Sequence, residues 1–394
     1  MADNNENKVL NVPHLRFPEF SGEWETKSIN DLADVIGGGT PDTTVKSYWD
    51  GGIQWFTPSE IGKNKFVDAS LRTITEDGLN NSSAKLLPPN TILLSSRATI
   101  GECSLSLREC ATNQGFQSLV SKKCNVDFLY YLIQTKKKDL IRKSCGSTFL
   151  EISANEVRKI QVSVPSDVEQ QKIAGLLSLI DKRIATQNKI IEKYESLIKG
   201  LNNILLYATG GKSVCLGDIL LERSERSRTN NQHEVLSSTV KGIFSQREYF
   251  SKDIASENNV GYKIIRLHDV VLSPQNLWMG NINYNDRFEI GIVSPSYKVF
   301  SIADGYDNQF VAAMLKTHRA LYSYMMVSEQ GASIVRRNLN MEAFSQLVFK
   351  IPSLDKQREI GCAISLLKSQ LKTANKIIRA YTSQKQYLLC QMFI

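Results

Sequence analysis

The chain has 394 residues, with 48 Lys and Arg against 40 Asp and Glu, a formal net charge of +8 and 42% hydrophobic residues. This length suits two or three domains, and the ordinary hydrophobic content argues against wholesale disorder. No apolar run approaches the roughly 18–20 residues of a membrane span, and the polar N-terminus lacks the apolar stretch of a signal peptide. We therefore expect a cytoplasmic protein without a membrane anchor.

The seven cysteines and four histidines are scattered along the chain. No two cysteines form a C-x-x-C pair, and no two histidines stand four residues apart. A disulfide framework or a zinc site needs closer, paired spacing, so this pattern predicts reduced thiols and no bound metal.

An internal repeat with an offset of 187 residues organises the sequence. The motif Pro-Ser-x-x-x-Gln occurs at residues 165–170 and again at 352–357. At this offset, 14 of the 42 positions beginning with Val164 are identical. A further match near the start of each copy keeps the same register, which predicts a tandem duplication of roughly residues 29–206 and 216–393.

Each repeat closes with a long segment that carries one apolar stripe. Its apolar residues step alternately by four and three over five heptads, which is typical of a coiled-coil seam. Gln187 and Lys385 occupy seam positions without being apolar. The apolar seam residues singled out are Ile173, Leu177, Ile180, Ile184, Ile191, Ile360, Ile364, Leu367, Leu371 and Ile378.

We predict that these two helices pack against each other in antiparallel fashion, which makes the repeats two-fold-related halves. A helix over residues 168–206 would be about 58 Å long, and Ser166 with Glu169 fits a capping box at its start. The alternative is two long helices buried separately in their own domains.

The segments before the helices have a mixed pattern, with short β-rich runs, turn residues and helical stretches. The predicted fold is α+β: two mixed α/β heads joined by two long helices that form an antiparallel coiled coil, with an internal pseudo-two-fold repeat. The expected boundaries are 1–165 (first head), 166–208 (first helix), 209–352 (second head) and 353–394 (second helix). Strands are expected at 91–94, 270–272 and 348–351, and helices near 126–143 and 307–327.

Motifs for catalysis are missing. Gly211-Lys212-Ser213 resembles the end of a phosphate-binding loop, but the earlier glycine position holds Leu206. The glycines of residues 37–40 lack dinucleotide-binding spacing and predict a flexible turn. We find no nucleophile elbow and no grouped carboxylates, and therefore expect a chain without catalytic activity or cofactor.

The remaining candidates are polar clusters suited to DNA, because Arg reads guanine, Asn and Gln read adenine, and cations bind phosphates. The alternative for each is a turn cap or a solvated charged face. In the first head they are Lys63, Arg97, Asn113 and Gln114. In the second head they are Arg223, Gln275, Asn276, Arg336 and Arg337.

Charge is concentrated in the helices. Residues 168–206 and 355–394 together carry +7 of the net +8, so the heads are almost neutral. DNA affinity of an isolated head should therefore be modest unless its charge is gathered in a groove.

Taken together, the pattern resembles the specificity subunit of Type I restriction-modification systems over essentially the whole chain. The first head carries Arg-Phe-Pro-Glu-Phe at 16–20 with Trp24, Gly-Gly-Thr-Pro at 38–41, and Thr-Asn-Gln-Gly-Phe at 112–116. The second head lacks the last two elements and has Ile-Val-Ser-Pro-Ser-Tyr at 292–297. It therefore resembles a different subclass of head.

The resemblance implies a non-catalytic reader of double-stranded DNA. Each head would be a target recognition domain for one part of a split sequence, and the helices would set the spacing. Two methyltransferase subunits would bring S-adenosylmethionine and adenine-N6 methylation. Two restriction subunits would bring ATP-driven, Mg-dependent cleavage. Because the heads differ, we expect an asymmetric target with half-sites about one helical turn, or about 34 Å, apart.

Two other functions remain open: a coiled-coil adaptor that binds protein without DNA specificity, and an enzyme that acts on nucleic acid alone. The adaptor would show no sequence-dependent duplex binding when mixed with methyltransferase subunits. The enzyme would methylate or cleave DNA as the purified chain, which the missing motifs disfavour.

Overall fold

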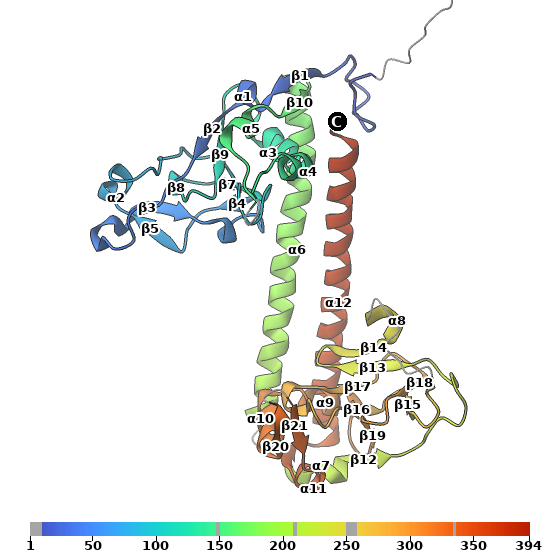
Figure 1. Cartoon of the computed structure of the whole chain (residues 1–394). Coiled ribbons are helices and arrows are strands. Elements are labelled where there is room, and N and C mark those ends of the chain that lie inside the picture. Colours follow the sequence, from blue (N-terminus) through green and yellow to red (C-terminus); the bar gives the residue numbers. More distant parts are fainter. Residues whose placement is uncertain (1–9, 147–149, 208–210, 250–257, 334–335) are drawn as a thin grey trace, which may run out of the picture. The chain divides into compact units, whose positions relative to one another are not determined.

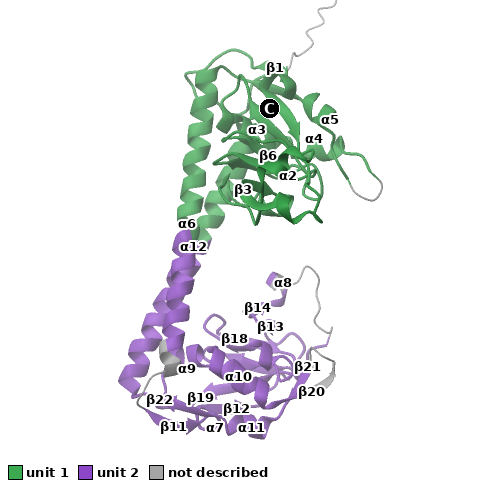
Figure 2. Ribbon diagram, turned by 90° about the vertical axis from the view of Figure 1, so that its left-hand side faces the viewer, with its two compact units in different colours: residues 1–188, 376–394 green, residues 189–375 purple. Residues whose placement is uncertain are grey.

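The computed structural model describes residues 10–146, 150–207, 211–249, 258–333 and 336–394, without the side chains of 204–207, 247, 249, 330–333 and 336. It has a mixed α/β composition. The chain divides into two compact units: unit 1 is residues 1–188 with 376–394, and unit 2 is residues 189–375 (Figure 2). Each unit contains one head and part of both long helices, whereas the sequence led us to treat the helices as separate segments.

Unit 1 is built around a five-stranded sheet with the order β2-β9-β6-β7-β4 (Figure 1). A second sheet, β5-β3-β8, and the strand pair β1-β10 complete the head. Its elements are β1 (Glu25–Ser28), α1 (Ile29–Leu32), β2 (Ala33–Gly37), η1 (Lys46–Tyr48), β3 (Trp49–Phe56), η2 (Pro58–Glu60), β4 (Phe66–Val67), β5 (Arg72–Ile74), α2 (Glu76–Asn80), β6 (Ile92–Leu94), β7 (Cys103–Ser106), β8 (Cys110–Thr112), β9 (Gln117–Ser121), α3 (Val126–Thr135), α4 (Lys137–Arg142), α5 (Ala154–Arg158) and β10 (Gln161–Val164).

Unit 2 repeats the same core with a four-stranded sheet, β12-β19-β16-β17, and the strand pair β11-β22. Among the described residues, unit 2 has three further strand pairs, β13-β14, β15-β18 and β20-β21, and no equivalent of the second sheet of unit 1. Its elements are β11 (Lys212–Cys215), α7 (Leu216–Ile219), β12 (Leu220–Arg223), β13 (Leu236–Thr239), β14 (Gly242–Ser245), α8 (Gln246–Tyr249), β15 (Lys263–Arg266), β16 (Val270–Leu272), η3 (Leu277–Met279), β17 (Ile282–Tyr284), β18 (Ile290–Val293), β19 (Lys298–Ile302), α9 (Asn308–Met314), α10 (His318–Met326), β20 (Ser328–Ser333), β21 (Arg336–Leu339), α11 (Met341–Ser345) and β22 (Val348–Ile351).

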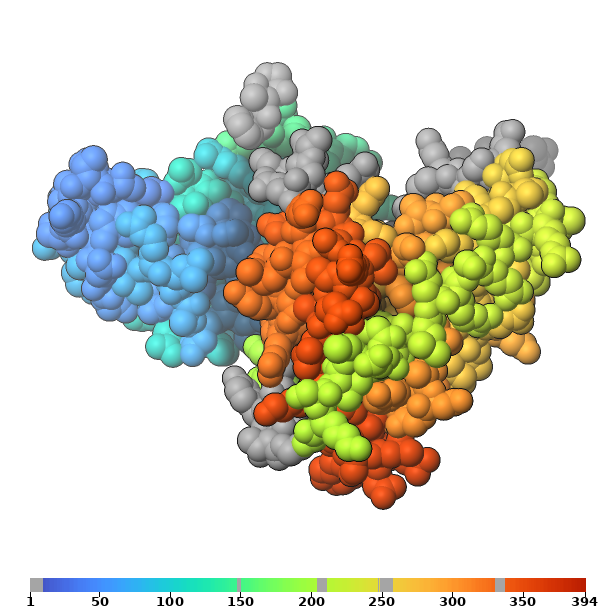
Figure 3. All heavy atoms as spheres, turned by 90° about the horizontal axis from the view of Figure 1, so that it is seen from below, coloured from blue at the N-terminus to red at the C-terminus, as the bar shows by residue number. Residues whose placement is uncertain are grey.

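The two heads thus share strand order as well as sequence register. The order β2-β9-β6-β7 corresponds to β12-β19-β16-β17, and every pair in both series is antiparallel. In the view of Figure 3, the yellow-green chain after α6 runs across the red-orange segment before α12, where β11 pairs with β22. The three predicted strands are present as β6, β16 and β22.

Both predicted head helices are interrupted. The helix expected near 126–143 is divided at Lys136 into α3 and α4, and the one expected near 307–327 is divided into α9 and α10. Asn125 and Asp307 cap α3 and α9 at equivalent places, since each side chain accepts a hydrogen bond from the third backbone N–H beyond it.

The long helices are α6 (Asp167–Tyr207) and α12 (Leu354–Gln391). In unit 1, residues 167–188 of α6 lie beside residues 376–391 of α12 and run in the opposite direction (Figures 1 and 2). The singled-out seam residues that are buried are Ile173, Leu177, Ile180 and Ile364. Those that are half-buried are Ile184, Ile191, Ile360, Leu367, Leu371 and Ile378.

A buried glutamine fastens each long helix to its own head. The side chain of Gln170 accepts a hydrogen bond from the Asn125 backbone N–H (2.9 Å) and donates one to the Pro165 carbonyl (3.0 Å). Gln357 makes the same pair of bonds with Asp307 (3.0 Å) and Pro352 (2.9 Å). The glutamine of the repeated motif therefore joins the capping residue of a head helix, α3 or α9, to the proline before the long helix.

The N-terminal motif holds the start of α6. Arg16 donates two hydrogen bonds to the Glu169 carboxylate, each 2.8 Å long, and Glu169 is only 1% exposed. The Glu169 carboxylate therefore binds the Arg16 guanidinium. The predicted capping box instead had this carboxylate accept a hydrogen bond from the backbone N–H of Ser166. The ring of Trp24 packs edge-on against Phe128 and Phe393, so the same segment also contacts the C-terminal end of α12.

Replacing Gln170 by Ala should lower the free energy of unfolding by about 2–4 kcal/mol, because the half-buried Asn125 N–H and the buried Pro165 carbonyl would lose their partner. Urea unfolding of the full chain, followed by circular dichroism, measures this effect. Gln384→Ala, at an exposed position of α12, is the matched control. Equal unfolding midpoints for the two variants would contradict the anchoring role.

Candidate nucleic-acid interface

Two loops of unit 1 meet at one edge of the main sheet and carry three of the predicted readers. The Ser96 N–H donates to the Gly115 carbonyl at 2.8 Å, and Ser95 forms a β-bridge with Phe116. Arg97, which follows β6, is thereby brought beside Asn113 and Gln114, which follow β8. Sequence distance gave no indication of this proximity.

The glycine-rich segment at residues 37–39 packs against the loop that carries Asn113 and Gln114. The Gly39 N–H donates to the Thr112 carbonyl at 2.8 Å, and an added Cβ at Gly38 would lie 2.1 Å from the Asn113 carbonyl oxygen. No side chain fits so close to a backbone oxygen, so the prediction of a flexible turn here is wrong. These glycines allow two backbone segments to approach each other closely.

The two amides of this loop have different environments. Asn113 is half-buried, and its side-chain oxygen accepts from the Gly115 N–H at 2.9 Å, an arrangement that closes a local turn. Gln114 is exposed, and its side-chain oxygen accepts a hydrogen bond from the Thr40 hydroxyl. Gln114 is therefore the better placed of the two to meet a base edge, since its side chain is exposed whereas Asn113 is half-buried.

Arg97 lies at the rim of a pocket of about 870 Å³ in unit 1. Its guanidinium is 2.9 Å from the Glu151 carboxylate, and the side chain remains 42% exposed. A second ion pair, Lys137 with Glu102, lies on the same pocket. An exposed Arg–Glu pair is weak and can exchange its carboxylate for a phosphate or a base.

Lys63 is exposed on the loop before β4. The N–H of the preceding residue, Gly62, donates to the Ser104 hydroxyl at 3.0 Å, and a Cβ at Gly62 would lie 2.8 Å from the Glu102 carboxylate. Because Glu102 also lines the pocket that contains Arg97, the backbone next to Lys63 lies near that pocket.

Unit 2 has an equivalent loop after β16. The Arg337 N–H donates to the Gln275 carbonyl at 3.2 Å, and the Arg337 guanidinium carbon lies 5.1 Å from the centre of the Trp278 ring. Gln275 is exposed, and Asn276 is half-buried at the start of η3. The structure thus joins Gln275, Asn276 and Arg337 and adds Trp278, which our candidate set omitted although a tryptophan in such a polar segment is a usable signal.

Of the two other arginines singled out in the second head, only the side chain of Arg223 is described, and it has different partners. Arg223 donates to Asp269, which is 3% exposed, at 3.0 and 3.2 Å, and is also paired with Glu225. Burial raises the pKa of Asp269 above its usual value in spite of this arginine. Arg223 therefore has a structural partner in its own head. The Arg336 side chain lies outside the described residues.

Lys65 was not singled out from the sequence, although its environment is distinctive. Its side chain is 8% exposed, and its ammonium lies 2.6 Å from Asp127 and 2.7 Å from the Ser178 hydroxyl. Lys65 therefore links β4 of the head to α3 and α6. A lysine two positions from Lys63 gave no sign in the sequence that it would be buried.

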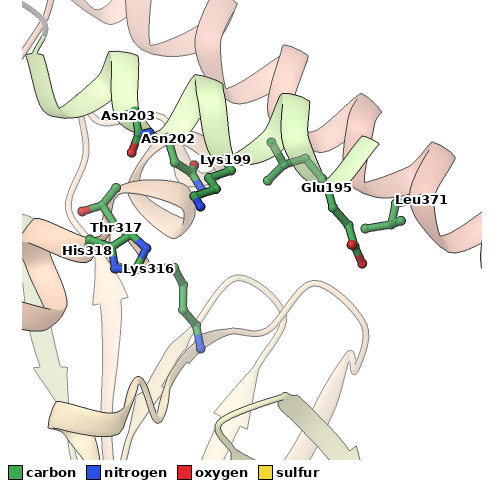
Figure 4. Close-up of a pocket in the computed structure, with 9 residues that line it drawn as sticks. Glu195, Lys199, Asn202, Asn203, Lys316, Thr317, His318 and Leu371 are labelled. Carbon is green, nitrogen blue, oxygen red and sulfur yellow. The ribbon is translucent and has the colours of Figure 1, made fainter. Parts of the chain in front are cut away.

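A pocket of about 230 Å³ in unit 2 lies between α6 and the link from α9 to α10 (Figure 4). Its lining includes Lys199, Asn202, Lys316 and His318. The Lys316 ammonium already donates to the Gly280 carbonyl at 2.7 Å, and burial lowers the pKa of Lys316 to about 8. In Figure 4, Asn202, Thr317 and His318 lie toward one end of the pocket and Glu195 toward the other.

Burial raises the pKa values of Cys103, Cys110 and Cys124 to about 12, so these thiols are protonated near neutral pH. Within the described part of the chain, no group of three or more His, Cys, Asp or Glu side chains is arranged to hold a metal ion. Among the described helices, none is both long and apolar enough to cross a membrane.

Comparison with known proteins gives one clear match to a family. Residues 21–196 match the model of the Type I restriction modification DNA specificity domain. Over this stretch the chain is similar to that family. The match spans the first head and the first part of α6, and it confirms the resemblance seen in the sequence for this part of the chain.

Curated relatives carry the same description. The Type I restriction enzyme MjaIX specificity subunit of Methanocaldococcus jannaschii is 40% identical over 179 residues, which are 43% of this chain and 41% of the relative. The EcoR124I/EcoR124II specificity subunit of Escherichia coli is 30% identical over 175 residues, 42% of this chain and 43% of the relative. The chain thus matches less than half of the length of either relative.

Solved structures show a likeness of fold over more of the chain. The S subunit of the Type I restriction-modification system from M. genitalium superposes with a TM-score of 0.61 at 16% identity, covering 97% of this chain and 99% of that one. A chain from a structural study of the assembly and conformational transition of the type I R-M system gives 0.53 at 13% identity, covering 96% and 98%. At these identities the likeness concerns the fold alone.

Replacing Gly38 by Ala should destabilise unit 1 by about 1–3 kcal/mol or more, because the new Cβ would collide with backbone that cannot move aside cheaply. Thermal unfolding of the full chain measures the loss. Gly52→Ala is the matched control, since a Cβ there meets no atom within 4 Å. A melting temperature unchanged by Gly38→Ala would show that the loop does not depend on this close approach.

Proposed function

We propose that the chain is a non-catalytic specificity subunit that reads an asymmetric, two-part DNA sequence, with one half-site for each head. The observation that carries this proposal is the pair of matching sheets with unlike loops at the same edge. Arg97 and Gln114 follow β6 and β8 in unit 1, while Gln275 and Arg337 occupy the corresponding edge in unit 2. One scaffold with two different sets of polar groups suits two different base sequences.

The long helices would act as the spacer between the half-sites, paired as an antiparallel coiled coil. The antiparallel contact in unit 1 supports this role, as does the seam, whose residues are buried or half-buried. Their net positive charge suits phosphates between the half-sites or acidic surfaces of partner subunits.

The chemistry would belong to partner proteins. Two methyltransferase subunits would supply S-adenosylmethionine and methylate adenine, and two restriction subunits would use ATP and Mg for cleavage. This division of labour is supported by the family of residues 21–196 and by the missing catalytic motifs. The chain itself would hold no cofactor.

The deciding experiment maps methylated adenines in DNA from cells that carry this chain with its methyltransferase subunits. We expect one asymmetric two-part sequence that disappears when the chain is deleted. Duplex binding without sequence preference in the reconstituted complex would instead favour an adaptor. Methylation or cleavage by the purified chain alone would contradict the non-catalytic assignment.

Arg97→Ala should relax recognition in one half-site only and reduce discrimination there by about 1–3 kcal/mol, the usual value of a specific arginine–base contact. Binding of a randomised duplex library by the complex measures the effect at each position. Arg108→Ala removes an exposed arginine paired with Asp68 in the same unit and is the control. A uniform loss across all sequences would make Arg97 a phosphate contact.

Removing residues 189–192 from α6 should change the accepted distance between half-sites, because four helical residues correspond to about 6 Å. Methylation of duplexes with graded spacers measures the preferred length. The control replaces exposed Lys189, Glu192, Lys193 and Glu195 by Ala and keeps the helix length. The same preferred spacer after the deletion would argue against a spacing role.

A further inference from the structure

An ion pair interrupts the apolar seam between α6 and α12 in unit 1. The Lys385 ammonium lies 2.8 Å from the Asp181 carboxylate, and the two side chains are only 17% and 15% exposed. The Tyr131 hydroxyl donates to the other oxygen of Asp181 at 2.6 Å. We call Asp181 and Lys385 the seam pair; it accounts for the lysine that departs from the apolar pattern.

The seam pair breaks the symmetry of the repeat. At the offset of 187 residues, the position equivalent to Asp181 holds Lys368, and the position equivalent to Lys385 holds Ile198. Counted from the capping residues Asn125 and Asp307, the equivalent of Tyr131 is Ala313. None of the three side chains is repeated in unit 2, so the pair belongs to one end of the helices only.

The rest of the seam discriminates poorly between partners. Both helices follow the same alternation of four and three, and 14 of 42 aligned positions are identical. Helices so alike can pair as α6 with α12, but also as α6 with α6 or α12 with α12 of a second copy of the chain. Apolar side chains alone would stabilise all three pairs to a similar degree.

The repeat offset shows what Asp181 and Lys385 would meet in each alternative. Between two copies of α6, Asp181 would face Ile198 of the other copy and leave a buried carboxylate without a cation. Between two copies of α12, Lys385 would face Lys368 of the other copy and place like charges together. Loss of the partner of a buried charge is strongly destabilising, whereas the intact pair contributes little net stability.

We propose that the seam pair selects the helix partner: it permits α6 to pair with α12 and disfavours the pairing of either helix with its counterpart from a second copy of the chain. A polar pair in a seam selects the helix partner when it destabilises the native pairing less than it destabilises the alternative pairings. The hydroxyl of Tyr131, a fully buried residue of α3, extends this preference to the head that packs on the pair.

The test uses the full chain, unfolded in urea and refolded at high concentration so that the helices choose their partners again. Light scattering after size-exclusion chromatography then gives the fraction of two-chain species. Asp181→Leu with Lys385→Leu removes the discrimination, and we expect this fraction to rise ~10-fold or more over that of the unsubstituted chain. Lys356→Leu with Glu359→Leu adds two leucines to an exposed part of α12 and should leave the fraction unchanged.

A second comparison tests the geometry of the alternative pairing. In the double variant Asp181→Leu with Lys368→Asp, Lys385 meets a carboxylate only when α12 pairs with α12 of a second copy. In the single variant Asp181→Leu, Lys385 meets no carboxylate in either pairing. We expect a larger two-chain fraction for the double variant and a decrease of that fraction as salt is added.

The proposal is overturned if the double-leucine variant refolds cooperatively as single chains to the same extent as the unsubstituted chain. It is equally overturned if Lys368→Asp does not raise the two-chain fraction in the Asp181→Leu background. Should the double-leucine variant fail to refold, the second comparison decides alone, because Lys368 is exposed and its replacement leaves the native seam intact.

Discussion

The attachment of each long helix to its head depends on one buried amide. Gln170 and Gln357 each connect a backbone N–H at the start of a head helix with the carbonyl of the proline that precedes the long helix. Without the glutamine, each of these buried or half-buried groups would lose this partner, which is costly in a protein interior. The direction in which each helix leaves its head is therefore fixed by hydrogen bonds that only an amide side chain of this length can make.

The two heads are alike near this glutamine attachment and differ in the sheets that lie farther from it. The strands and short helices next to the glutamine correspond in both units, as do the pairs β1-β10 and β11-β22. Farther away, unit 1 has the sheet β5-β3-β8, while the described part of unit 2 has the separate strand pairs β13-β14, β15-β18 and β20-β21. The polar loops that we assign to DNA arise at the boundary between these regions, on strands whose positions the common core determines.

Much of this architecture could be predicted because it depends on periodicity. The repeat offset and the alternation of four and three located α6 and α12, and the β-rich runs located β6, β16 and β22. The environment of single side chains could not be predicted, because it depends on tertiary neighbours. Arg223 and Arg97 look alike in the sequence, yet Arg223 is bound to the buried Asp269, whereas Arg97 is paired with the partly exposed Glu151 and stays 42% exposed itself. The sequence likewise suggested that Gly38 and Gly39 form a flexible turn, because it does not show the backbone segments that pack against them.

The composition of unit 1 has a consequence for the order of events during synthesis. Leu388, Met392 and Phe393 belong to its apolar core, beside Trp24 and Phe128, although nearly two hundred residues of unit 2 are translated in between. Unit 2 is one continuous stretch and has its whole core as soon as residue 375 has left the ribosome. The domain that begins first is thus the one completed later, and nascent chains must keep its unfinished apolar surface from aggregating until residues 376–394 arrive.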